Sequence, residues 1–357
     1  MTAFWLLLVA VSQAYPLLDD AYSPAEEFSN DLAERVSRES ALSPDLRANP
    51  DTCVALNPHS VFYNRVPKAA STSLKTLASQ RAHKNGYIHI SSTVYNDRGF
   101  FETDQEEANV QRIQAIFDQY DKVLYDQHIR FLNFSKFGKH QPAYINMVRE
   151  PISRAVSTYY FARVGQHSRR DEIRALLGEQ ADWDINTCID RREECRWFTS
   201  KIEHFNLMTR FFCGHSEACR VVDDAAFEVA KYNLEHNFVF VGVTERFAES
   251  VRVLEKILPK FFRGAYRTIS SAAPDASRQN VNKKAGAKPN QENLEILQHL
   301  ARYDLALYQF ASGLFERKLQ ACFSGLDVPA AEQSPSLGEQ TSQGGSYDVN
   351  GFSVPRA

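Results

Sequence analysis

A lysine and three consecutive hydroxyl residues lie where an apolar segment passes into a helix. Residues 60–66 read as a strand, Lys68 falls in the turn after it, and Ser71, Thr72 and Ser73 lead into the helix. A helix N-terminus presents free backbone N–H groups and the positive end of the helix dipole, and the lysine adds a mobile full charge. No glycine occurs in this segment, so it is not a Walker loop. The pattern predicts a phosphate-binding loop of another kind; a solvated lysine beside an ordinary helix cap is the alternative.

A second charged residue follows another apolar segment. Residues 143–149 read as a buried strand that ends in Arg149, and a proline then opens the next helix. Open α/β sheets place their ligands at the carboxyl ends of strands, which is where Arg149 lies. Apolar residues at 152, 155, 156 and 159 leave Arg154 and Ser157 off the apolar stripe of that helix. For Arg149 the alternative is a salt bridge, and for Ser157 it is a packing role.

The third candidate is His128, which directly follows a predicted strand at 122–127. A neutral imidazole with an ordinary pKa of about 6.5 can take a proton from a hydroxyl group. The chain has ten histidines, so position alone does not single this one out as a catalytic base.

The predicted elements alternate along the chain. Strands are predicted at 60–66, 86–91, 122–127, 143–149 and 237–243. Helices are predicted at 72–83, 104–119, 151–164, 223–235, 245–258 and 290–318. This alternation indicates an α/β fold with a mostly parallel sheet flanked by helices.

Composition sets broad limits on partners and on size. The 357 residues, 43% of them hydrophobic and 24% charged, are sufficient for one sizeable globular core. The formal net charge is −3, so nothing global marks a nucleic-acid or other polyanion binder. Any site for an acidic substrate must therefore be a local basic patch.

The six cysteines indicate an oxidising compartment. Two close pairs, Cys188/Cys195 and Cys213/Cys219, suit two small disulfide loops. A zinc site is the alternative, but neither pair has the CxxC form and no histidine pair follows at ligand spacing, so we predict no metal. The two remaining cysteines flank the predicted sheet region, and their pairing stays open: Cys53 and Cys322.

Several motifs together resemble the carbohydrate sulfotransferases that use 3′-phosphoadenosine 5′-phosphosulfate (PAPS), in particular the uronic acid 2-O-sulfotransferases. The segment 65–73 looks like the heparan sulfate branch, whereas 128–138 and 184–188 look more like the dermatan/chondroitin uronyl branch. Four further motifs suit both branches, at 211–219, 230–233, 241–245 and 258–264. The resemblance runs from about residue 57 to about residue 318 and implies a P-loop-like sulfotransferase fold.

The resemblance assigns donor contacts to individual residues. It implies that the 5′-phosphosulfate is held by the loop after the first strand, with Arg65 adding positive charge and the other contacts made by Lys68, Ala69, Ala70, Ser71, Thr72 and Ser73. It places Arg149 and Ser157 at the 3′-phosphate, where a guanidinium fork suits the ligand. Lys68 is our candidate for stabilising the leaving phosphate oxygen.

For the acceptor, the resemblance implies a glycosaminoglycan chain and His128 as the catalytic base. One departure is Asp126, where the heparan branch carries a further histidine. Arg163 and Arg174 follow the second phosphate helix and are candidate acceptor contacts, with a solvated charged face as the alternative. Another Golgi carbohydrate sulfotransferase, or an inactive glycosaminoglycan-binding protein on this fold, are the competing functional hypotheses.

The resemblance also implies a Golgi membrane or lumenal protein, with type II topology if it is anchored, and suggests a homotrimer. We expect a signal peptide or short membrane anchor at 1–14, a stem at 15–56, the sulfotransferase domain at 57–322 and a disordered tail at 323–357. Asn133 lies in the sequon Asn-Phe-Ser and is a predicted glycosylation site.

Overall fold

The computed structural model describes residues 49–94, 99–165, 170–199, 204–271 and 286–324. They contain a five-stranded parallel sheet in the compact unit Met1–Cys322. The strands are β1 (Ser60–Asn64), β2 (Ile88–Ser91), β3 (Val123–Gln127), β4 (Ala143–Val148) and β5 (Phe238–Val243). All five predicted strands and the parallel α/β class are thereby confirmed.

The sheet order is β2-β3-β1-β4-β5. From β1 the chain passes to the β2 and β3 side, whereas from β4 it passes to β5 on the opposite side. The chain therefore reverses direction across the sheet between the neighbouring strands β1 and β4. In open α/β sheets, such a switch point leaves a crevice at the carboxyl ends of the strands, where ligands bind.

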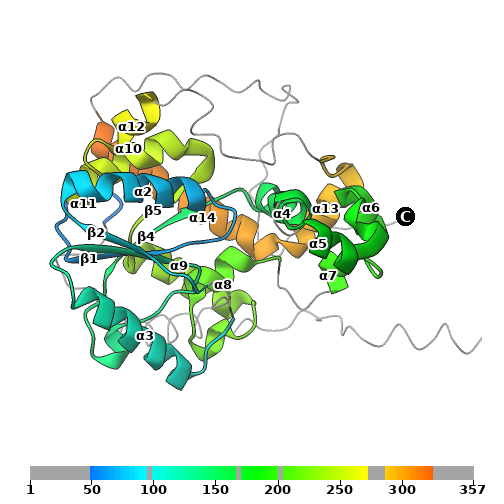
Figure 1. The fold of residues 1–357 in the computed structure, drawn as a ribbon, viewed down its shortest axis with the longest axis horizontal. Coiled ribbons are helices and arrows are strands. Elements are labelled where there is room, and N and C mark those ends of the chain that lie inside the picture. The colour runs from blue at the N-terminus through cyan, green and yellow to red at the C-terminus, as the bar shows by residue number, and fades with distance from the viewer. Residues whose placement is uncertain (1–48, 95–98, 166–169, 200–203, 272–285, 325–357) are drawn as a thin grey trace, which may run out of the picture. The chain divides into compact units, whose positions relative to one another are not determined.

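Helices cover both faces of the sheet. Figure 1 shows α2, α10 and α11 on one face and α3 and α9 on the other. Strands β3, β4 and β5 are buried along their whole length, as expected for parallel strands covered on both sides. The helices are α2 (Ser71–Asn85), α3 (Thr103–Phe117), α4 (Pro151–Tyr160), α5 (Arg170–Leu177), α6 (Ile185–Asp190), α7 (Arg196–Thr199), α8 (Leu207–Cys213), α9 (Asp224–His236), α10 (Phe247–Ile257), α11 (Pro259–Phe262), α12 (Ala265–Ser271), α13 (Gln291–Leu300) and α14 (Arg302–Phe323).

Two predicted helices differ from those observed. The helix predicted at 151–164 is α-helical only to Tyr160 and continues as a π-helix, Phe161–Gly165. The helix predicted at 290–318 is two helices, because Ala301 caps α13 before α14 begins. Several helices were not predicted, and each spans at most eight residues, too few for a clear 3.6-residue pattern: α5, α6, α7, α8, α11 and α12.

All six cysteines form disulfide bonds. Cys188–Cys195 and Cys213–Cys219 confirm the two predicted loops. A third bond, Cys53–Cys322, joins residues 269 positions apart and ties the segment before β1 to the end of α14. The same two segments are also linked by Arg317, which pairs with Asp51 at 2.7 Å.

The predicted signal peptide or anchor, most of the stem and nearly all of the tail lie outside the described residues. Among the helices that are described, none has both the length and the apolar character needed to cross a bilayer.

Candidate active site

The loop between β1 and α2 has a strained backbone. Lys68 and Ala70 adopt left-handed conformations with φ of 67° and 52°, which cost non-glycine residues roughly 1 kcal/mol or more each. Ala70 occupies the N-cap position of α2, and no side chain of the described residues caps the helix there. Its first backbone N–H groups are therefore available to an anion, as the sequence predicts for this loop.

The Lys68 side chain is half-buried against an aromatic ring. Its Nζ atom is 3.9 Å from the centroid of the Phe161 ring, in the π-helical turn that follows α4. Burial, and then the charge of Arg149, lowers the pKa of Lys68 to about 8. An ammonium held this way gains more from an incoming anion than a hydrated one does, because part of its desolvation has already occurred.

Arg149 joins the two loops. It follows β4 directly, and its Nη1 atom donates to the carbonyl oxygen of Lys68 at 3.1 Å. Burial lowers the pKa of Arg149, and the carboxylates of Glu245 and Glu150 oppose that shift. Within the described part of the chain no carboxylate forms an ion pair with this guanidinium, and its role at an anion stays a prediction. Ser157 lies further along α4 and is buried.

The Glu150 side chain caps the N-terminus of α4. Its carboxylate accepts hydrogen bonds from the backbone N–H groups of Ile152, at 2.9 Å, and Ser153, at 2.6 Å. This cap holds the first turn of α4 in place. It therefore also restricts the backbone of Arg149, which lies between the end of β4 and the cap residue.

A pair of buried asparagines aligns the two strand ends. Asn146 of β4 donates through Nδ2 to the carbonyl oxygen of Asn64 at 2.7 Å and to its side-chain oxygen at 2.8 Å. Both asparagines are almost fully buried. Neither was singled out from the sequence, although a polar residue inside an apolar strand is a usable signal, because burial requires it to find a partner.

His128 lies at the same carboxyl edge, directly after β3. Its Nδ1 atom is 2.7 Å from the backbone carbonyl oxygen of Arg65. A carbonyl oxygen can only accept, so Nδ1 carries the proton and Nε2 is the nitrogen that can accept one. The side chain of Arg65 is also engaged, with Nε 2.7 Å from Oδ1 of Asp126.

Arg154 corrects the expectation that it lies off the core. It is 1% exposed. Its Nη2 atom donates to the carbonyl oxygen of His204 at 2.6 Å and lies 3.6 Å from Oδ2 of the buried Asp304. Ser157 is likewise buried. The buried surface of α4 is therefore wider than its apolar stripe indicates. Arg154 can be buried there because Asp304 of α14 supplies a carboxylate near its guanidinium.

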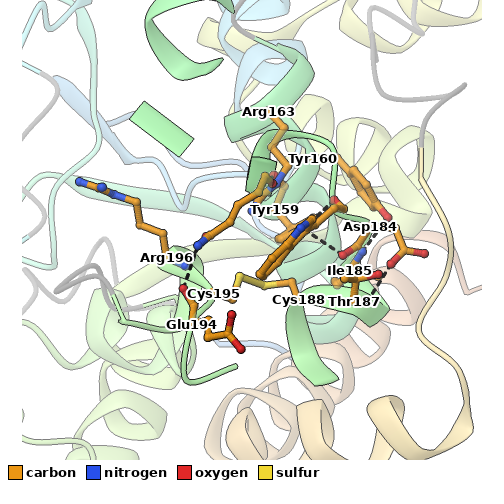
Figure 2. The surroundings of a disulfide bond; sticks show 12 residues. Tyr159, Tyr160, Arg163, Asp184, Ile185, Thr187, Cys188, Glu194, Cys195 and Arg196 are labelled. Atoms are coloured by element: carbon orange, nitrogen blue, oxygen red, sulfur yellow. Dashed lines mark hydrogen bonds between the residues drawn. A yellow bond between two sulfur atoms is a disulfide. The ribbon is translucent and has the colours of Figure 1, made fainter. Parts of the chain in front are cut away.

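The two candidate acceptor contacts have different environments. Arg163 is buried, with its guanidinium 3.6 Å from the Tyr159 ring and its Nη1 atom donating to the Tyr159 carbonyl oxygen at 3.3 Å. Figure 2 shows these two side chains beside the Cys188–Cys195 bond. Arg174 is exposed and pairs with Asp182 at 2.5 Å, so a solvated charged face describes it well. An acceptor contact stays a prediction for both arginines.

The predicted glycosylation site is Asn133. It is half-buried, and its Oδ1 atom accepts from the backbone N–H of Lys136 at 3.2 Å, so glycosylation there stays a prediction.

Among the residues placed in the structure, no three of the types His, Cys, Asp and Glu form a group that could hold a metal ion.

The chain matches a known protein family over most of its length. The model of the "Sulfotransferase family" matches residues 52–311. Heparan sulfate 2-O-sulfotransferase 1 of Xenopus laevis is 35% identical over 267 residues, which cover 72% of this chain and 70% of that protein. The Homo sapiens protein of the same name is 31% identical over 324 residues, 87% of each chain. Uronyl 2-sulfotransferase of Homo sapiens is 31% identical over 266 residues, 72% of this chain and 63% of that protein.

Proposed function

Because this chain belongs to the sulfotransferase family, we propose that it transfers a sulfuryl group from PAPS to the 2-O position of a uronic acid in a glycosaminoglycan such as heparan sulfate. The observation that carries the proposal is the hydrogen bond from Arg149 to the Lys68 carbonyl. It brings two cationic loops together at the switch point of the sheet, where a ligand with two separated anionic groups can contact both.

The residues present fit such a donor. The uncapped start of α2 and the left-handed backbone at Lys68 and Ala70 direct N–H groups toward one anionic end, which we assign to the 5′-phosphosulfate. The guanidinium of Arg149, with Ser157 on the following helix, suits the 3′-phosphate.

The chemistry divides between two side chains. His128 takes the proton of the acceptor hydroxyl on Nε2, because its Nδ1 proton is held by the Arg65 carbonyl. An oxygen–sulfur bond then forms to the sugar, and the bond from sulfur to the bridging phosphate oxygen breaks. Lys68 stabilises the negative charge that develops on that oxygen, in a position where partial burial strengthens the interaction.

The names of the relatives support the acceptor class. One name specifies heparan sulfate and a 2-O position, and the other specifies a uronyl group and position 2. The second candidate is therefore a dermatan/chondroitin uronyl 2-O-sulfotransferase, which uses the same donor chemistry on a different chain.

The test uses the full chain, radiolabelled donor, and desulfated heparan and dermatan offered in parallel. Disaccharide analysis is expected to place the label at O-2 of the uronic acid. Label only on hexosamine contradicts the acceptor assignment, and binding of heparan without transfer supports an inactive glycosaminoglycan-binding protein instead.

Replacement of His128 tests the assignment of the base. His128→Ala is expected to lower the rate by about 10²–10⁴-fold while binding of adenosine 3′,5′-bisphosphate persists. The matched control is His140→Ala, since His140 is exposed and has no part in the site. Turnover of His128→Ala near that of the control means that another residue is the base.

We also propose that the protein works in the Golgi lumen or at its membrane and that it forms a homotrimer. Three disulfide bonds support an oxidising compartment. Imaging of the tagged full chain tests the location, and light scattering of the purified protein tests the trimer.

A further inference from the structure

Asp126 is a buried carboxylate that the proposed mechanism does not use. It is 0% exposed and lies near the end of β3. Its Oδ1 atom is 2.7 Å from Nε of Arg65 and accepts from the Ser91 hydroxyl at 3.0 Å. Its Oδ2 atom is 2.7 Å from Nε2 of His89. A buried carboxylate with three polar partners from two other segments indicates a specific role, because burial of a charge is costly unless it is well paired.

Asp126 and His128 both contact the same residue. Two positions apart at the end of a strand, they contact different parts of Arg65: Asp126 contacts the guanidinium, and His128 Nδ1 contacts the backbone carbonyl at 2.7 Å. The backbone N–H of Arg65 also donates to the Gln127 carbonyl at 2.8 Å. Other residues therefore hold both the side chain and the backbone of Arg65. Its carbonyl oxygen is kept within hydrogen-bonding distance of His128 Nδ1.

Asp126 balances the charge of the residue whose carbonyl binds His128. Its Oδ1 atom lies 2.7 Å from Nε of the positively charged Arg65 guanidinium, and it is two positions from His128 along the chain. Without the carboxylate, the uncompensated guanidinium would disfavour the protonated form of His128, and one of the two contacts that hold Arg65 would be lost.

We propose that Asp126 is a positioning residue that, through Arg65, sets the tautomer and the proton affinity of His128. The proposal rests on the proposed function, in which His128 is the base. Asp126 touches neither the donor nor the acceptor; it prepares the imidazole with its proton on Nδ1 and its acceptor nitrogen on Nε2.

The test replaces Asp126 with asparagine and follows the His128 ring by nitrogen NMR in the folded full chain. In the wild type the Nδ1-protonated tautomer is expected to predominate. In Asp126→Asn the tautomers are expected to mix, and the titration midpoint of His128 is expected to fall by about one unit. In parallel, the acid limb of the rate–pH profile shifts to lower pH by the same amount, and kcat falls about tenfold or more.

The matched control is Glu106→Gln. Glu106 is also a buried carboxylate in an ion pair, with Lys136 Nζ at 2.8 Å, but it has no contact with Arg65. This variant is expected to lower stability and to leave the tautomer and titration of His128 unchanged. A similar change in both variants indicates a general effect of destabilisation and overturns the proposal.

Asp126→Asn leaves a buried cation unbalanced, so it can fail to fold. The double variant Arg65→Gln/Asp126→Asn removes both charges and leaves no lone ion. If Asp126 acts through Arg65, adding Asp126→Asn to Arg65→Gln changes the His128 titration by less than about 0.3 unit. If Asp126→Asn changes the His128 titration as much in the Arg65→Gln background as in the wild type, Asp126 does not act through Arg65 and the proposal is wrong.

The NMR measurements need no turnover. A wild-type protein without sulfotransferase activity refutes the proposed function, whereas an unchanged His128 ring in Asp126→Asn refutes only the positioning role.

Discussion

Lys68 provides a quantitative test of the anion site, because its charge depends on pH in the working range. Burial and the neighbouring Arg149 lower its pKa in the free protein to about 8 from an ordinary 10.5. An anion bound beside the ammonium favours the charged form and raises the pKa again. Binding of adenosine 3′,5′-bisphosphate above pH 8 must therefore be coupled to proton uptake by Lys68.

The size of the proton uptake follows from the pKa of Lys68 in the free protein, which is about 8. At pH 9 only about a tenth of the molecules carry a charged Lys68, so binding takes up about 0.9 proton, against about 0.1 proton at pH 7. The association constant falls about tenfold between these two pH values, which corresponds to about 1.4 kcal/mol.

Whereas binding of the nucleotide weakens as the pH rises, the Lys68 contribution to the stability of the ligand-free protein is expected to increase. Between pH 8 and 10.5 the unfolded chain, with an ordinary lysine, binds more protons than the folded chain. The contribution of Lys68 to the free energy of unfolding therefore rises with pH through this window. Urea unfolding of the ligand-free protein at several pH values measures this trend.

Calorimetry in two buffers of different ionisation enthalpy measures the proton uptake at pH 7 and pH 9. Lys68→Arg is the control, because a guanidinium stays charged throughout this range and should bind with no linked uptake. Equal heats in both buffers at pH 9 for the wild type, or the same uptake in Lys68→Arg, would refute the placement of Lys68 at the bound anion.

Two further predictions concern stability. Arg154→Met is expected to lower the free energy of unfolding by about 3–5 kcal/mol, measured by urea unfolding, because it leaves the buried Asp304 without its cation; a loss below about 1 kcal/mol would show that the ion pair does not matter. Cys53→Ser/Cys322→Ser is expected to cost about 3–5 kcal/mol by the same measurement, because the bond closes a loop of 269 positions. Equal stability of this double variant and the wild type would contradict that loop-closure argument.

Much of the fold could be predicted because the relevant signals are local. Each of the five strands is a short apolar run next to a turn, and the run at 237–243 is continuous because β5 is buried on both faces. The anion loop was also predictable: a lysine in a turn before a helix that opens with hydroxyl residues is a chemical pattern within ten positions. The short helices were missed because they contain too few residues to show a period.

Features that depend on residues distant in the sequence could not be read in this way. Arg149 reaches the Lys68 carbonyl, 81 positions away, only because β1 and β4 are neighbours in the sheet. The burial of Arg154 depends on a carboxylate of α14, and neither this ion pair nor the left-handed φ of Lys68 follows from local spacing.

The amino-acid sequence by itself determined the class of fold and two of the disulfide loops, and it indicated candidate residues for the chemistry, because these depend on residue type and on short spacing. Only the tertiary structure decided which nitrogen of His128 carries the proton, which charge balances Arg65, and how Cys53 pairs. The physical reason is that a tautomer, an ion pair and a long-range disulfide each depend on the distance between atoms, and the folding of the sheet sets those distances.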